Sequence, residues 1–157
     1  MASNTPRSKR LSSTTAPRDD GGIGCVLIVD DDAAIRMVCA ISLRAEGLSV
    51  IEAPDGLRGL EQARRQRPDL VLTDVRMPGL DGFRLARALR ADARTRSIPL
   101  IFLSAETGKA NADQARALGA LAYLTKPFDP CGLASFVARS LAAARLASAD
   151  LTLTVAS

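Results

Sequence analysis

Short apolar runs alternate with segments of helical periodicity through the central part of the chain. Five of these runs lack the strict apolar–polar alternation of a strand with one exposed face: CVLIVD (25–30), LSVIEA (48–53), DLVLTD (69–74), IPLIFLS (98–104) and ALAYLT (120–125). Such runs are typical of parallel strands that are covered on both faces. They predict five strands, each followed by a helix.

The intervening segments place apolar residues at helical spacing. The expected core positions are Ile35, Val38 and Ile41, then Leu57 and Leu60, then Phe83, Ala86 and Leu89, and finally Leu133, Phe136, Val137 and Leu141. A fourth, Ala-rich segment near 108–118 has the weakest pattern. Five strand–helix units with short connections predict an α/β fold, a flavodoxin-like (βα)5 doubly wound parallel sheet with strand order 2-1-3-4-5.

The two ends of the chain fall outside this pattern. Residues 1–24 are rich in Ser, Thr, Pro, Arg and Gly, so we expect a disordered tail there, with an organellar transit peptide as the alternative. The end of the chain, SADLTLTVAS, alternates weakly and has no obvious partner strand, so we expect residues 147–157 to form a loose tail. The folded domain is therefore expected to span residues 25–146.

Composition limits the chemistry that this chain performs alone. The 157 residues suit one domain, and 47% are apolar, enough for a sizeable core. The formal net charge of +4 is modest. Arg84, Arg87 and Arg90 are therefore expected to form a solvated helix face, and no nucleic-acid interface is expected.

Cysteine and histidine usage narrows the function classes further. The three cysteines lack the spacing of a metal site, and no apolar run is long enough to span a membrane, which favours a cytoplasmic protein with no membrane partner. Histidine is absent. Any step that needs a phosphohistidine or a histidine base must therefore use another molecule.

Aspartates occur in two kinds of position. Four precede helical segments and are expected to cap them: Asp32, Asp55, Asp81 and Asp129. Asp30, Asp31 and Asp74 instead stand at the ends of the first and third strands. In a sheet of this order, ligands bind outside the carboxyl ends of the strands, at the switch point between strands one and three. We therefore expect these three carboxylates to share one crevice.

The residues expected at this edge suit phosphoryl transfer. Carboxylates in contact raise each other's pKa, and a divalent cation removes the conflict. Mg²⁺ fits because it prefers oxygen ligands and usually takes only one or two carboxylates. Ser104 ends the fourth strand and Lys126 follows the fifth. A carboxylate nucleophile, a metal, a hydroxyl and an ammonium group together provide what phosphoryl transfer needs.

Four segments, VLIVDDD, LVLTDVRMPGLDG, IPLIFLSA and YLTKPF, resemble the receiver domain of bacterial two-component response regulators, of the single-domain, chemotaxis-regulator-like kind. The resemblance covers residues 24–146. It implies that Asp74 is the phosphoacceptor. It also implies that Mg²⁺ is bound directly by Asp31, mainly through water by Asp30, and by Asp74 and the backbone carbonyl of Arg76.

The resemblance further implies a switch. Ser104 would be the switch hydroxyl, and Lys126 would bridge to the phosphoryl group, with a cis Lys126–Pro127 bond. Tyr123 would move inward when Ser104 reorients. That movement would change the face made by the fourth helix, the fifth strand and the fifth helix, where an unknown downstream protein or a second copy of the chain would bind.

The same resemblance implies the partners. A histidine kinase or a histidine phosphotransferase would donate the phosphoryl group. The chain would take part in its own phosphorylation and dephosphorylation without turning over an external substrate. Because little sequence follows residue 146, we expect a single-domain response regulator, with an intermediate receiver of a longer phosphorelay as the alternative.

An enzyme alternative is a haloacid dehalogenase-type phosphatase. Asp30 and Asp32 match the start of its DxD motif, but position 34 is Ala. The chain is also short for that fold, which would leave TDVRMPGLDG and YLTKPF unexplained.

One pair of charges is particular to this sequence. Arg76 lies two residues beyond Asp74, and Glu106 lies two residues beyond Ser104. In the receiver family these positions flank the acyl phosphate and influence its hydrolysis. Here they carry opposite charges, and our hypothesis is that they pair across the mouth of the pocket and hinder the attacking water. The alternative is two independent exposed side chains.

Overall fold

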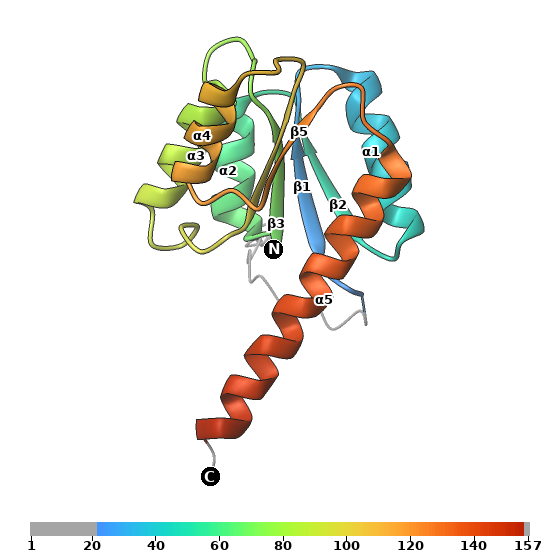
Figure 1. Ribbon diagram of the computed structural model, residues 1–157, viewed down its shortest axis with the longest axis vertical. Coiled ribbons are helices and arrows are strands. Elements are labelled where there is room, and N and C mark those ends of the chain that lie inside the picture. Colours follow the sequence, from blue (N-terminus) through green and yellow to red (C-terminus); the bar gives the residue numbers. More distant parts are fainter. Residues whose placement is uncertain (1–21, 156–157) are drawn as a thin grey trace, which may run out of the picture.

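The computed structural model describes residues 22–155 and contains five strand–helix units (Figure 1). The elements are β1 (Cys25–Val29), α1 (Ala33–Ala45), β2 (Ser49–Ala53), α2 (Gly56–Gln66), β3 (Leu70–Asp74), α3 (Gly82–Ala91), β4 (Leu100–Ser104), α4 (Lys109–Ala117), β5 (Ala122–Thr125) and α5 (Pro130–Val155). All strands are parallel, in the order β2-β1-β3-β4-β5. The predicted fold class and strand order are confirmed. Residues 1–21 of the expected N-terminal tail lie outside the described residues.

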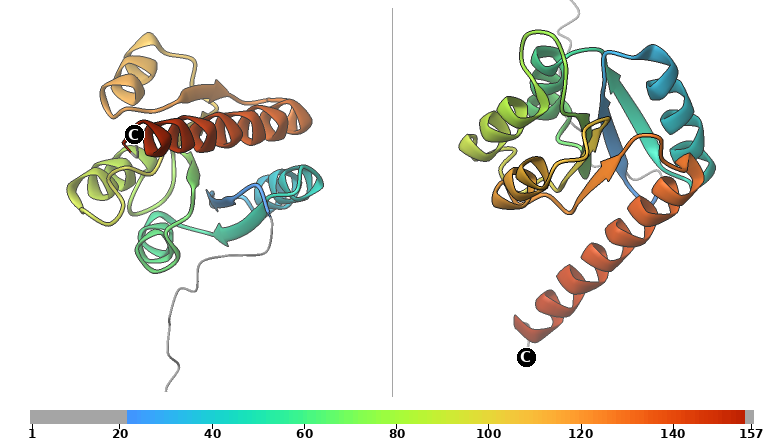
Figure 2. Two further views of the ribbon diagram at one scale, coloured as in Figure 1. Left: turned by 90° about the horizontal axis from the view of Figure 1, so that it is seen from below. Right: turned by 45° about the horizontal axis from the view of Figure 1, so that its top comes forward.

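The sheet is buried on both faces between two layers of helices (Figures 1 and 2). Alternate residues of β1 point to opposite sides, as the period of a strand requires. Val26 and Ile28 pack with α1 and α5. Leu27 and Val29 pack with the cluster under α2 and α3. This explains why the strands read as continuous apolar runs.

The buried face of α1 differs from the predicted one. Val38 is 42% exposed and Ile41 is 60% exposed. Ile35, the third predicted position, is partly buried against the core, and the fully buried residues of the helix are Cys39, Ala40 and Leu43. Two of these three side chains, Cys39 and Ala40, are small, so a search for large apolar residues selected Val38 and Ile41 in their place.

A similar difference occurs on α2. Leu57, an expected core residue, is 68% exposed, whereas Gly56, Gly59 and Ala63 are buried. A Cβ atom on Gly59 would lie 2.7 Å from a methyl carbon of Val29. The helix therefore packs through its glycines, which a search for large apolar residues passes over. The core positions expected on α3, namely Phe83, Ala86 and Leu89, are confirmed as buried.

The C-terminal segment was expected to be loose, and that expectation is wrong for the described part. Helix α5 continues to Val155 and extends beyond the body of the domain in Figure 1. An alternating run without a partner strand gains no ladder hydrogen bonds, whereas an existing helix gains one bond for each residue added. Within residues 22–155, no helix is both long enough and apolar enough to cross a membrane.

Candidate functional site

The carboxyl ends of β1 and β3 bring three aspartates together, as predicted. Asp30 and Asp31 follow β1, and Asp74 is the last residue of β3. One carboxylate oxygen from each lies within 4.8 Å of the others. Asp30 is 1% exposed and Asp74 is 7% exposed, while Asp31 is open to solvent. The crevice at the switch point of the sheet is therefore strongly acidic and only partly hydrated.

The four aspartates that were expected to precede helices do so, and they lie outside the cluster. Asp32, Asp55 and Asp81 accept hydrogen bonds from backbone N–H groups in the first turns of α1, α2 and α3. The carboxylate of Asp129 accepts from the N–H of Cys131 at 3.2 Å. Because Asp32 caps α1 and lies outside the cluster, the geometry gives no support to the phosphatase alternative, which needs a paired Asp30 and Asp32.

Lys126 supplies one positive charge to this cluster. Its Nζ lies 3.2 Å from Oδ2 of Asp30 and 3.5 Å from Oδ2 of Asp74. The lysine reaches the cluster from the end of β5, across β4, and the Lys126–Pro127 bond that follows is cis, as predicted. A single ammonium group is thus shared by two buried carboxylates.

Burial and charge move the pKa values of these groups in consistent directions. Burial raises the pKa of Asp30, although the N–H of Asp32 and the charge of Lys126 oppose that rise. Burial and then the negative charge of Asp30 raise the pKa of Asp74. Burial would lower the pKa of Lys126, but the two carboxylates outweigh it and raise that pKa. Further positive charge would stabilise the ionised carboxylates.

The donor set fits a hard divalent cation. It consists of carboxylate oxygens, one of them solvent-accessible, with no sulfur or imidazole among them. Mg²⁺ prefers such oxygen ligands and keeps several of its waters, for which the exposed side of Asp31 leaves room. The additional ligand expected from the backbone carbonyl of Arg76 stays a prediction.

Two glycines shape the loop that follows β3 and Asp74. Gly79 adopts a φ of 78°, a left-handed conformation that favours glycine, and nothing lies within 4 Å of its Cβ position. Gly82 begins α3 so close to β3 that a Cβ atom there would lie 2.1 Å from the carbonyl oxygen of Asp74. These glycines bend the chain away from the carboxylate and pack the helix beneath it.

Ser104 ends β4 beside the cluster and is fully buried. Its Oγ accepts a hydrogen bond from the backbone N–H of Glu106 at 3.0 Å. The hydroxyl of Tyr123 donates to the backbone carbonyl of Glu106 at 2.9 Å. The two expected switch residues therefore bind the backbone of the same residue, Glu106, a link that spacing along the sequence did not reveal.

Arg76 and Glu106 form an ion pair, as the hypothesis required, although their side chains are 75% and 38% exposed. The other carboxylate oxygen of Glu106 accepts from Nδ2 of Asn111 on α4 at 2.8 Å. These three side chains line a pocket of about 380 Å³ beside the β3–α3 loop. Asn111 was missed from the sequence because a single amide in an Ala-rich helix carries no distinguishing signal.

Comparison with known proteins gives one consistent result. The family described as response regulator receiver domain matches residues 26–138. The transcriptional regulatory protein CseB of Streptomyces coelicolor is 43% identical over 104 residues, which are 66% of this chain and 43% of that protein. The DNA-binding response regulator MtrA of Mycobacterium tuberculosis is 39% identical over 105 residues, 67% of this chain and 45% of that protein. The chain thus spans less than half the length of these relatives.

Solved structures match over nearly their full length. The chemotaxis protein CheY4 of Vibrio cholerae is 34% identical with a TM-score of 0.69, over 73% of this chain and 96% of that chain. A putative response regulator from Chloroflexus aurantiacus is also 34% identical, with a TM-score of 0.70 over 76% of this chain and 98% of that chain.

Proposed function

This chain belongs to the response regulator receiver domain family, and from that premise we propose that Asp74 accepts a phosphoryl group in the presence of Mg²⁺. The observation that carries the proposal is the sharing of one ammonium, on Lys126, by two buried carboxylates with a third beside them. A site that served stability alone would not leave the excess negative charge of these carboxylates uncompensated. Three carboxylates and one ammonium group leave a net charge of −2, which one divalent cation would offset.

Each residue has a distinct part in the proposed transfer. A carboxylate oxygen of Asp74 attacks phosphorus, the new P–O bond forms, and the bond to the donor nitrogen breaks with its electron pair passing to the imidazole. Lys126 moves its contact from Asp74 to a phosphoryl oxygen. Mg²⁺, held by Asp30, Asp31 and Asp74, would neutralise negative charge on the transferring group. The Ser104 hydroxyl would donate to a further phosphoryl oxygen.

The donor histidine lies outside this sequence, because its 157 residues contain none. A histidine kinase or histidine phosphotransferase fits that need, and the family is a signalling family rather than one of conventional enzymes. Within the proposal, the chain turns over no external product and acts in the cytoplasm. An intermediate receiver of a longer phosphorelay is the alternative, and it would pass the phosphoryl group from Asp74 to a second histidine.

The proposed output uses the link from Ser104 to Tyr123. If Ser104 turns toward the phosphoryl group, its Oγ gives up the N–H of Glu106, and the carbonyl of the same residue shifts under the Tyr123 hydroxyl. The β4–α4 loop and the position of Tyr123 then change together. Such a two-state element converts a local charge into a change of surface.

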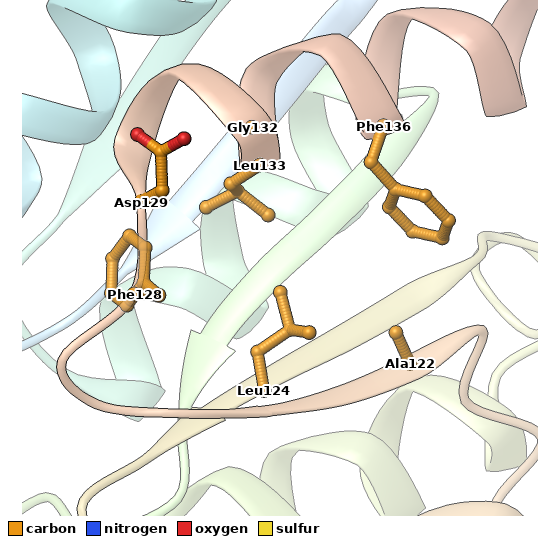
Figure 3. A pocket seen from close by; sticks show the side chains of 7 residues that line it. All are labelled: Ala122, Leu124, Phe128, Asp129, Gly132, Leu133 and Phe136. Atoms are coloured by element: carbon orange, nitrogen blue, oxygen red, sulfur yellow. The ribbon is translucent and has the colours of Figure 1, made fainter.

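The face formed by α4, β5 and α5 has two hollows at which a partner would recognise that change. Strand β5 is an edge strand, with a hollow of about 240 Å³ on its α4 side, lined in part by Tyr123. Figure 3 shows the apolar hollow on its α5 side, about 380 Å³, where Ala122 and Leu124 face Leu133 and Phe136. We propose a downstream protein or a second copy of the chain as the partner here, with no membrane or nucleic acid.

Intact-mass spectrometry with acetyl phosphate tests the proposal. Wild type is expected to gain one phosphoryl group in the presence of Mg²⁺ and none after chelation, and Asp74→Ala is expected to gain none. Asp55→Ala, which removes a helix cap, is the matched control and should be phosphorylated like wild type. Failure of folded wild type to gain phosphate, from acetyl phosphate and from a competent kinase, would overturn the proposal.

A further inference from the structure

Arg36 lies on the side of α1 that faces the sheet. It precedes the buried residues Cys39, Ala40 and Leu43 by three, four and seven positions, the spacing of one helical stripe. Its side chain is only 17% exposed. An arginine in such a position needs specific partners, because burying a guanidinium group without them is costly.

Arg36 has two partners, the backbone carbonyl of Asp30 and the carboxylate of Glu52 on β2. Nη1 donates to the backbone carbonyl of Asp30 at 2.7 Å. Nε lies 3.6 Å from Oε1 of Glu52 on β2. The guanidinium thus joins α1 to β2 and to the residue that follows β1, Asp30, which also belongs to the group of three carboxylates.

The bond to Asp30 fixes a peptide unit that no strand holds. The N–H of Asp30 donates to the carbonyl of Ala53, but the pairing of β1 with β3 ends one residue earlier, at Val29. The carbonyl of Asp30 belongs to the peptide that leads into Asp31. If this peptide rotated, the carboxylate of Asp31 would leave the position in which it lies near Asp30 and Asp74.

We propose that Arg36 is a positioning residue for the Mg²⁺ site: by holding the Asp30 carbonyl, it presets the direction of the Asp31 carboxylate. Glu52 orients the guanidinium in turn. This inference rests on the proposed function, since it concerns the same cation. Groups that orient metal ligands typically change metal affinity 10- to 100-fold when they are removed.

Isothermal titration of Mg²⁺ into the folded protein tests the role of Arg36. Arg36→Met keeps the length of the side chain but removes its donors, and we expect its dissociation constant for Mg²⁺ to rise about tenfold or more. Arg36→Lys keeps one donor but loses the two-sided geometry, so an intermediate rise is expected. Arg139→Met is the matched control, because Arg139 also donates to a backbone carbonyl, that of Ser135, but on α5.

Thermal unfolding without Mg²⁺ distinguishes positioning from simple support of the fold. A merely structural role would lower the stability of Arg36→Met while leaving the Mg²⁺ affinity of the folded protein within twofold of wild type, and that result would overturn the inference. If Arg36→Met does not fold, Arg36→Lys and Glu52→Gln decide by the same criterion. If wild type binds no Mg²⁺, the proposed function is overturned together with this inference. If wild type binds Mg²⁺ and both Arg36→Lys and Glu52→Gln bind it equally well, this inference alone is overturned.

Discussion

The two ends of the sheet use charged side chains in opposite ways. At the amino end, the carboxylate of Asp69 accepts from the N–H of Cys25 at 2.7 Å. Arg90 donates to the carbonyls of Arg96, Ile98 and Leu118 at 2.7–3.0 Å. These charges are matched by neutral backbone groups that the fold itself supplies. They hold loops in place and need no ligand.

At the carboxyl end the matching is incomplete. Asp30 and Asp74 share Lys126, and Asp31 adds a third carboxylate nearby. The backbone gives each buried carboxylate one donor, the N–H of Asp32 for Asp30 and the N–H of Arg76 for Asp74, and three negative charges still meet one ammonium group. The charged groups at the amino end are therefore fully matched by the fold, whereas the carboxylates at the carboxyl end need a bound cation to offset their excess negative charge.

Replacing the shared ammonium should produce the largest effect. Lys126→Met removes the positive charge that meets the phosphoryl oxygens, and the rate of phosphorylation by acetyl phosphate should fall about 100-fold or more. The rate is measured by intact mass against time with saturating Mg²⁺. A rate close to that of wild type would show that Lys126 only relieves repulsion between the aspartates.

Replacing Arg90 at the amino end should lower stability and leave the phosphorylation rate unchanged. Arg90→Met leaves several carbonyls without their donor, and the free energy of unfolding should fall by about 2–3 kcal/mol, as measured in urea. The phosphorylation rate of the folded variant should stay at the wild-type value. A loss of phosphorylation in the folded protein would contradict the separation of the two ends.

Neutralising one carboxylate at the acidic end should stabilise the protein when Mg²⁺ is absent. Asp74→Asn removes a charge whose pKa is raised by burial and by Asp30, and we expect the free energy of unfolding at pH 7 to rise above that of wild type. Mg²⁺ should remove this advantage, because it stabilises wild type and binds the variant less well.

The pH dependence of that gain has a definite sign. Because the pKa of Asp74 is raised above its ordinary value of 3.8, the folded state binds protons that the unfolded chain has already lost. The stability cost of ionised Asp74 is therefore greatest above the folded-state pKa and disappears as pH falls toward 3.8. The difference between wild type and Asp74→Asn should shrink as the pH falls from 7 toward 3.8, and a difference that stays constant over this range would contradict the assignment.

The smallest effect is expected at the mouth of the pocket. Breaking the exposed pair with Arg76→Ala or Glu106→Ala should shorten the phosphate half-life by no more than about fivefold, since such pairs are worth ~0–1 kcal/mol. Asn111→Ala leaves the ion pair and is the control. Unchanged half-lives in both variants of the pair would mean that it does not hinder the attacking water.

The regular features of this fold could be predicted from the sequence because they repeat. Buried parallel strands read as apolar runs, and the aspartates that precede helices read as caps, which left Asp30, Asp31 and Asp74 as the unusual ones. The roles of Arg36 and Arg90 could not be predicted. Arg90 was assigned to a solvated face, yet it binds three carbonyls, because helical spacing does not indicate which loop folds back over an arginine.

Titration of Mg²⁺ into two variants, each with one aspartate replaced at one end of the sheet, tests most directly whether the carboxyl end is the end that needs a cation. Wild type should bind one Mg²⁺ at pH 7, Asp31→Asn should lose most of that affinity, and Asp69→Asn should bind like wild type, since its carboxylate is already matched by the N–H of Cys25. Equal affinity in Asp31→Asn and wild type, or no binding by wild type, would contradict a cation-dependent site between β1 and β3.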